Sequence, residues 1–314
     1  GFLAVVWTDA IQAILMLLAL LIAPISVISG AGGIDAVWSQ MQAANPDSTA
    51  LFSNMTAIGL LSLLAWGLGY VGQPHILARF MAVENAQKIR PARRIAMVWM
   101  LIVLCGSVTT GLAGIAYFAD QPLANPETVF IVLSQSLFNP WVAGIITAAI
   151  LSAIMSTIDS QLLVSSSVIS EDFYRVFIKP KASEKELLLV SRIAVVAIAV
   201  LALFIASDRE SRVLDLVSYA WAGFGAAFGP VIVFSLFWRK MTAMAAIVGM
   251  IIGAVTVVVW SNLEGGIFDL YEIVPGFVFA SLAVIGISLM KPQQGQIALQ
   301  QFDEAASLLE ETQQ

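Results

Sequence analysis

The sequence predicts an all-α polytopic membrane protein. Hydrophobic residues make up 59% of its 314 residues and charged residues only 11%, whereas a soluble domain carries about 25% charged residues. Eight segments are apolar over about the 20 residues that a membrane-spanning helix needs. These segments are 3–28, 57–74, 95–118, 141–168, 188–207, 213–237, 241–260 and 270–290.

The positive charges predict the orientation of these helices. Thirteen of the fifteen Lys and Arg residues fall on one side, with Arg209 and Arg212 as the exceptions. The positive-inside rule makes the Lys- and Arg-rich side cytoplasmic, which places Gly1 and Gln314 in the cytoplasm. We expect a transmembrane domain over residues 1–292 and a cytoplasmic tail over residues 293–314.

The composition argues against several classes of protein. Cys105 and His75 are the only residues of their kinds, which excludes an intramolecular disulfide and argues against a zinc site or a Ser-His-Asp triad. No other pairing of nucleophile and base stands out, so we do not expect an enzyme. Nucleic acid is not an expected partner, because the sequence has no basic patch. The chain begins at Gly1 without an initiator Met, and we expect it to be part of a longer polypeptide.

The fourth predicted helix, 141–168, carries polar residues at membrane depth. Residues 153, 156, 157 and 160 lie on one side of a helix, because residues three and four apart are neighbours. A single serine such as Ser152 or Ser165 is typical of helix packing or of a bond to the preceding turn. Asp159 beside Ser156, Thr157 and Ser160 points to function instead, since a carboxylate inside a membrane is costly without a partner.

The second predicted helix, 57–74, carries signals of an interruption. Three glycines and a proline fall within eight residues: Gly67, Gly69, Gly72 and Pro74. Such residues weaken a helix, and the freed backbone groups must line a cavity or meet a ligand. Trp66, Tyr70 and Pro74 recur at i, i+4 and i+8 on one face. That face fits either a binding site or a packing groove for another helix, and the residues alone leave both open.

Two other polar or glycine-rich positions have a simpler interpretation. Asp9 and Gln12 lie one turn apart near the start of the first helix, where interfacial polarity is readily tolerated. The sixth helix contains four closely spaced helix breakers or small residues, Gly223, Gly225, Gly229 and Pro230. We interpret these as small-residue packing. A short helix is expected within the loop 119–140.

Four segments resemble the sodium:solute symporter family, and within it the branch of bacterial sodium/proline symporters. They are GFLAVVWTDAIQ, AWGLGYVGQPHILARFMA, SAIMSTIDSQLLVSSSVISEDFYR and YAWAGFGAAFGP. The resemblance extends over nearly the whole chain, to about Pro292. It implies a five-plus-five inverted-repeat transporter fold. This chain resembles the last eight helices of that fold: the final helix of the first repeat, the whole second repeat and two peripheral helices.

The resemblance also implies roles for individual residues. The carbonyl of Ala153 and the hydroxyls of Ser156 and Thr157 match the sodium ligands of the family. Some relatives place a second sodium near Asp159 and Ser160. The positions of Trp66, Tyr70 and Pro74 match those that shape the proline pocket, and the absent N-terminal half would supply the remaining contacts.

The implied function is sodium-coupled import of L-proline across the bacterial cytoplasmic (inner) membrane, with Na+ as the coupled ion. A sodium- or proton-coupled symporter for another amino acid or a carboxylate is the nearest alternative. A membrane sensor or channel is less favoured, because the sequence contains neither a signalling domain nor a ring of charges.

Overall fold

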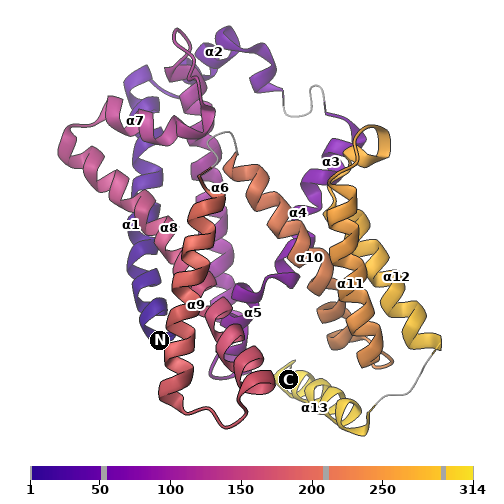
Figure 1. Ribbon diagram of the computed structural model, residues 1–314. Coiled ribbons are helices and arrows are strands. Elements are labelled where there is room, and N and C mark those ends of the chain that lie inside the picture. The colour runs from indigo at the N-terminus through magenta and orange to yellow at the C-terminus, as the bar shows by residue number, and fades with distance from the viewer. Residues whose placement is uncertain (1, 51–54, 208–211, 291–294, 314) are drawn as a thin grey trace. The chain divides into compact units, whose positions relative to one another are not determined.

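The computed structural model describes residues 2–50, 55–207, 212–290 and 295–313, and all the regular secondary structure in them is helical (Figure 1). The chain divides into two compact units. Unit 1 comprises Gly1–Asn54 and Arg90–Ile198, and unit 2 comprises Met55–Ile89 and Ala199–Gln314. Each unit is described by itself below.

The number of spanning helices agrees with the sequence. Seven helices in the described residues are long and apolar enough to cross a membrane, and a bent pair makes an eighth if it counts as one span. The seven are α1 (Phe2–Ala31), α6 (Ile89–Tyr117), α8 (Pro140–Ser167), α9 (Glu184–Ile205), α10 (Val213–Phe237), α11 (Ala243–Trp260) and α12 (Ile273–Met290). Gly1, Arg209, Lys291 and Gln314, which entered the orientation argument, lie outside the described residues.

Unit 1 is built on the packing of α1 against α8. Ala19 of α1 is buried with Ile146 and Ala149 of α8, so small side chains let the two helices approach closely. The short helix predicted within 119–140 is confirmed: η4 (Pro126–Thr128) leads into α7 (Val129–Leu137). Leu133 of α7 is buried in a second cluster with Val27 and Ala113, which fixes α7 against α1 and α6.

The segment 29–56, predicted as a loop, contains a helix of its own. Helix α2 (Ile34–Ala44) is followed by η1 (Pro46–Thr49). Val37 and Met41, one turn apart, are buried against Ala116. The helix therefore forms because one face of a short amphipathic segment packs on α6.

Helix α8 continues beyond its predicted end. It passes directly into η5 (Val168–Ile178), a stretch with π-helical hydrogen bonding. A short turn then leads to α9, and ion pairs join the two arms of this hairpin. Arg175 pairs with Glu184 at 3.2 Å, and Lys179 pairs with Glu186 at 2.8 Å.

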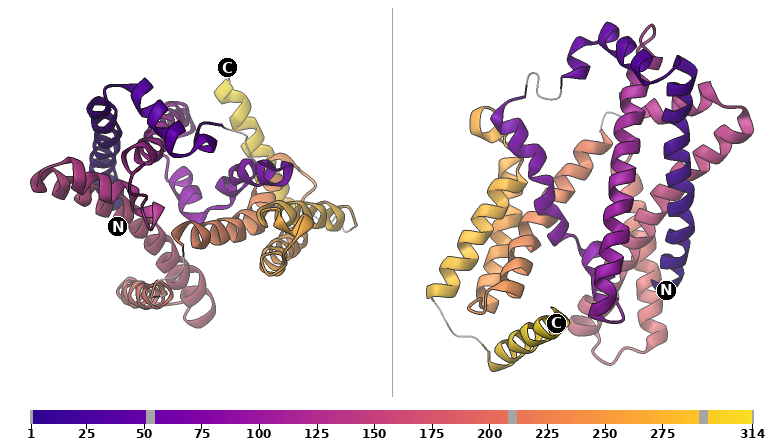
Figure 2. Two further views of the ribbon diagram at one scale, coloured as in Figure 1. Left: turned by 90° about the horizontal axis from the view of Figure 1, so that it is seen from above. Right: turned by 180° about the vertical axis from the view of Figure 1, so that it is seen from behind.

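In unit 2, α10, α11 and α12 lie side by side (Figure 2). Ala222 and Ala226 of α10 are buried with Val257 of α11 and Ile273 just inside α12. Helix α10 runs unbroken through Pro230, and both Gly225 and Gly229 are buried. The packing interpretation of this segment is confirmed for these residues.

The bent pair in unit 2 is the interrupted helix that the sequence predicts. It consists of α3 (Ala57–Leu64), α4 (Trp66–Gly69), η2 (Tyr70–Gly72) and α5 (Pro74–Met81), with a bend of 48° between its two halves. Gln73 is extended, with ψ of 115°, because proline disfavours helical backbone at the preceding residue. The predicted end at residue 74 is wrong, since proline is well suited to start a helix and α5 begins there.

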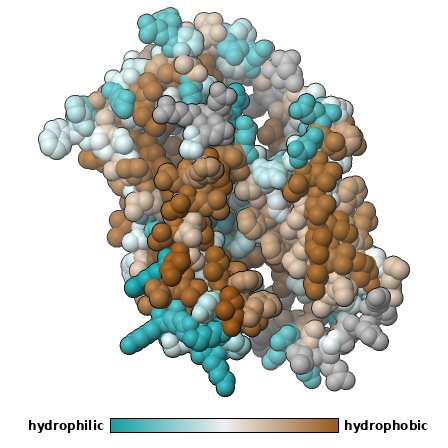
Figure 3. Space-filling model, in the orientation of Figure 1, coloured by the Kyte–Doolittle hydropathy of each residue, from teal (hydrophilic) through white to brown (hydrophobic). Residues whose placement is uncertain are grey.

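On the face shown in Figure 3, hydrophobic side chains gather along the middle of the helices and hydrophilic residues near their ends. Trp141 and Phe204 are 86% and 79% exposed, as expected for side chains that contact lipid. The remaining elements are η3 (Ala86–Lys88), η6 (Gly266–Asp269) and α13 (Gln296–Gln313). Asp303 of α13 forms two hydrogen bonds of 2.8 Å with the Arg239 guanidinium.

Candidate functional site

The candidate sodium ligands lie on α8 in unit 1. The hydroxyl of Thr157 donates a hydrogen bond to the carbonyl of Ala153 at 3.3 Å, which brings these two oxygens together. Ser156, one residue earlier, is half-buried. A hydroxyl that donates its proton keeps lone pairs that a cation can use. The helix geometry therefore fits a cluster of oxygen ligands, and the ligand assignment stays a prediction.

Thr157 is exposed, whereas the next two candidate positions on α8, Asp159 and Ser160, are at least partly covered by protein. Ser160 is buried, and its hydroxyl donates to the carbonyl of Ser156 at 2.9 Å. Asp159 is half-buried. No cluster of three His, Cys, Asp or Glu residues occurs within the described ranges, so a cation on α8 would depend on hydroxyl and carbonyl oxygens.

One polar atom of Gln12 in α1 is covered by protein. Its Oε1 atom is covered by protein and has no hydrogen-bond partner among the residues that the structure describes. Gln12 as a whole is partly exposed, and its interfacial position stays a prediction. Gln12 lies two turns before Ala19, the residue through which α1 packs on α8. Asp9, the second residue of the predicted pair, is half-buried one turn earlier.

The candidate substrate residues lie in unit 2, within a cluster of four aromatic rings. The ring centroid of Trp66 lies 6.0 Å from that of Trp221 and 5.8 Å from that of Tyr271. Tyr70 meets Trp221 edge to face at 4.9 Å. Such geometries contribute about 0.5–1.5 kcal/mol per pair beyond the area that they bury. The structure thus brings Trp66 and Tyr70 together through a third ring.

Two glycines of the interrupted helix let α10 approach it closely. A Cβ atom on Gly69 would lie 1.9 Å from Nε1 of Trp221, and one on Gly72 would lie 2.5 Å from the carbonyl oxygen of Phe224. Both distances are far below van der Waals contact. The glycines predicted to weaken the helix therefore also make room for α10.

Side chains also bind the interrupted helix to its neighbours. Gln73 is only 3% exposed, and its Nε2 donates to the carbonyl of Trp221 at 3.2 Å. Pro74 follows as the half-buried first residue of α5. The backbone N–H of Tyr271 donates to the hydroxyl of Ser62 at 3.0 Å.

Sequence reasoning missed Gln73, Trp221 and Tyr271 as neighbours of the candidate substrate site. Trp221 was included in a segment interpreted as small-residue packing, although it is the one tryptophan among those small residues. That contrast in size was the available signal. Tyr271 had no comparable signal, because it sits at the boundary of a loop and α12.

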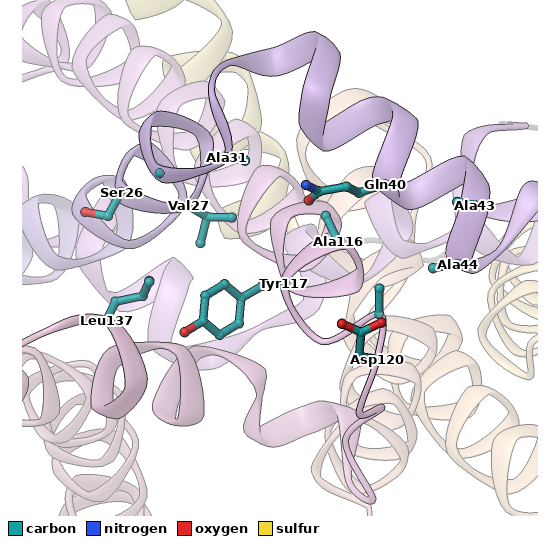
Figure 4. Close-up of a pocket in the computed structure, with 12 residues that line it drawn as sticks. Ser26, Val27, Ala31, Gln40, Ala43, Ala44, Ala116, Tyr117, Asp120 and Leu137 are labelled. Carbon is teal, nitrogen blue, oxygen red and sulfur yellow. The ribbon is translucent and has the colours of Figure 1, made fainter.

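A cavity of about 650 Å³ lies elsewhere in unit 1, among α1, α2, α6 and α7 (Figure 4). Its polar lining comes from Ser26, Gln40, Tyr117 and Asp120, and its apolar lining includes Val27. None of the residues predicted for sodium or substrate lines this cavity. The candidate sodium residues belong to unit 1 and the candidate substrate residues to unit 2.

Comparison with known proteins identifies the family. The model of the sodium:solute symporter family matches residues 1–253. The sodium/proline symporter of Haemophilus influenzae is 52% identical over 99% of this chain and 64% of its own length. The high-affinity proline transporter PutP of Bacillus subtilis is 47% identical over 97% of this chain and 64% of its own length. The chain therefore spans less than two thirds of these relatives.

A solved structure supports the fold. The substrate-bound, outward-open state of a Na+-coupled sialic acid symporter matches with a TM-score of 0.70, covering 92% of this chain and 63% of that chain. At 19% identity the likeness concerns the fold alone, and it agrees with the five-plus-five inverted-repeat architecture. Together with the family match over residues 1–253, it shows that this chain belongs to the sodium:solute symporter family.

Proposed function

We propose that the chain is part of a sodium-coupled importer of L-proline. The observation that carries this proposal is the 47–52% identity, over more than 90% of the chain, to relatives named as proline transporters. In this proposal residues 1–292 are the transmembrane portion and residues 293–314 are a cytoplasmic tail. The rest of the polypeptide supplies the remaining contacts to sodium and substrate.

In the proposed mechanism, sodium binds to the carbonyl of Ala153 and the hydroxyls of Ser156 and Thr157. Oxygen ligands suit a hard cation. A second ion position lies near Asp159 and Ser160. Sodium favours the state open to the outside, because a ligand shifts an equilibrium only through its different affinities for the two states.

L-Proline then packs its ring against Trp66 and Tyr70, with Pro74 shaping the floor of the pocket. The interruption between α4 and α5 supplies free backbone groups that can meet the charged ends of an amino acid.

A membrane potential of 100 mV adds about 2.3 kcal/mol for each positive charge moved inward. The positive-inside rule orients the helices so that both termini face the cytoplasm of a bacterial cell.

The test is uptake of labelled L-proline by the full-length protein in proteoliposomes, under an inward sodium gradient or an inward proton gradient. Thr157→Ala is compared with Thr147→Ala, because Thr147 lies on the same helix and makes the same kind of bond, to the carbonyl of Ala143 at 2.9 Å. We expect sodium-driven uptake, and a sodium requirement raised at least tenfold by Thr157→Ala alone.

Two other results would contradict parts of the proposal. Equal effects of Thr157→Ala and Thr147→Ala would remove Thr157 from the sodium site and leave the transported solute unchanged. Absence of proline uptake under either gradient would reject proline as the substrate and favour another amino acid or a carboxylate.

A further inference from the structure

Trp221 of α10 forms hydrogen bonds with the interrupted helix both before the break and at the break. Its indole Nε1 donates to the carbonyl of Trp66 at 3.0 Å, before the break. Its own carbonyl accepts from Nε2 of Gln73 at 3.2 Å, at the break itself. One residue of α10 therefore ties together the two ends of the segment that contains Tyr70.

The Trp221 ring also fills the space over Gly69. A Cβ atom on Gly69 would lie 1.9 Å from Nε1 and 2.3 Å from Cδ1 of this ring. The ring contacts Tyr70 edge to face and lies tilted beside Trp66. Any rotation or shift of the indole would consequently move both rings.

Tyr271 is the second aromatic neighbour of Trp66. Its hydroxyl donates to the carbonyl of Ser218 at 2.7 Å, three residues before Trp221 on α10. Its ring stacks on Trp66 with an interplanar angle of 28°. Trp66 thus contacts a ring from α10 and a ring from the segment that precedes α12. The polar atom of each of these two rings donates a hydrogen bond to a backbone carbonyl.

We propose that Trp221 is a positioning residue for the substrate site: its indole and backbone carbonyl hold the interrupted helix so that Trp66 and Tyr70 present their rings at a fixed spacing to a small cyclic amino acid. This inference rests on the proposed function. It predicts that loss of the indole N–H weakens the binding of proline, and does not only affect folding.

The first test compares Trp221→Phe with Trp260→Phe in the full-length protein. Trp260 is a matched control in the same unit, because its Nε1 also donates to a backbone carbonyl, that of Leu270 at 2.9 Å. We expect Trp221→Phe to raise the KM for proline about three- to tenfold, as expected for loss of one hydrogen bond. Trp260→Phe should leave that KM unchanged. Equal KM values for the two variants would overturn the proposal.

The second test uses the space over Gly69. Gly69→Ala is compared with Gly67→Ala, because a Cβ atom on Gly67 would meet no atom within 4 Å. We expect Gly69→Ala to raise the proline KM more than tenfold and Gly67→Ala to leave it unchanged. In the double variant with Trp221→Leu, the smaller side chain should relieve the clash and bring the KM below that of Gly69→Ala. If the KM increases of Gly69→Ala and Trp221→Leu simply add in the double variant, the inference is contradicted.

A third readout needs no transported substrate. Hydrogen exchange of the backbone amides between residues 66 and 73 should be faster in Trp221→Phe than in the wild type, and unchanged in Trp260→Phe. If the wild type takes up no proline but this difference is found, the proposed substrate is wrong and the holding role of Trp221 stands. If proline uptake is normal and neither exchange nor KM changes, the positioning role is rejected.

Discussion

The crossing of α10 and α11 gives a quantitative prediction for Gly253→Ala. A Cβ atom at this position would lie 2.3 Å from the carbonyl oxygen of Ala226 and 3.0 Å from Cα of Ala227. Ordinary contact begins near 3.4 Å, so the two helices must separate by about 1 Å. Both obstructing atoms belong to the backbone and cannot rotate away.

Overpacking of this kind costs about 1–3 kcal/mol, and backbone obstruction places Gly253→Ala at the upper end. Replacing Gly by Ala inside a helix returns about 1 kcal/mol. We therefore expect a net loss of about 1–2 kcal/mol in the free energy of unfolding, which lowers the ratio of folded to unfolded protein roughly 5- to 30-fold.

The assay is unfolding in detergent micelles with an increasing fraction of a denaturing detergent, followed by the loss of helical circular dichroism. Gly286→Ala in α12 is the matched control, because a Cβ atom there would meet nothing within 4 Å. Gly286→Ala should be as stable as the wild type or more stable. The reasoning is refuted if both variants unfold at the same fraction of denaturing detergent.

Two further predictions concern the tail and α8. The hydrogen bonds from Arg239 lower the pKa of Asp303 below its usual value of about 3.9. Because the pKa is lowered, the ion pair stabilises the docked tail fully at pH values above the usual carboxyl pKa. This stabilisation is lost as the pH falls through the lowered pKa. A fluorescent probe on Ser307 should therefore report docking at pH 5–7 and release only as the pH falls below the usual carboxyl pKa of about 3.9, whereas the tail of the Asp303→Asn variant should be released throughout this pH range. Asn139 caps α8 by accepting from the N–H groups of Trp141 and Val142, both at 3.1 Å. Asn139→Ala should cost about 1 kcal/mol of unfolding free energy in the same detergent assay, and an unchanged midpoint would show that this cap does not contribute.

The elements that follow from local chemistry were predicted correctly. The spacing of apolar residues gives the number of spanning helices, because a bilayer sets a fixed length. The interruption of the second helix follows from Gly69, Gly72 and Pro74. Its continuation as α5 was missed, because a proline that ends one helix is equally suited to begin the next.

The elements that depend on distant contacts were not predictable. Helix α2 forms where Val37 and Met41 meet Ala116 on α6. Pro230 leaves α10 unbroken although Pro74 marks a break, and both prolines follow closely spaced glycines. The contact of Trp221 with Gly69 joins residues far apart in the chain. No spacing rule connects them, so the third ring of the aromatic cluster could be found only in the structure.

The glycines of unit 2 bear on how this protein tolerates mutation. Every missense change at a glycine adds at least a Cβ atom. At Gly72 and Gly253 that atom meets backbone of a neighbouring helix, whereas at Gly67 and Gly286 it meets nothing within 4 Å. Chemically identical residues within one unit therefore fall into opposite classes. In a library of all single substitutions, every replacement of Gly72 or Gly253 would be depleted, whereas Gly67 and Gly286 would accept small side chains. The amino-acid composition does not reveal which glycine belongs to which class.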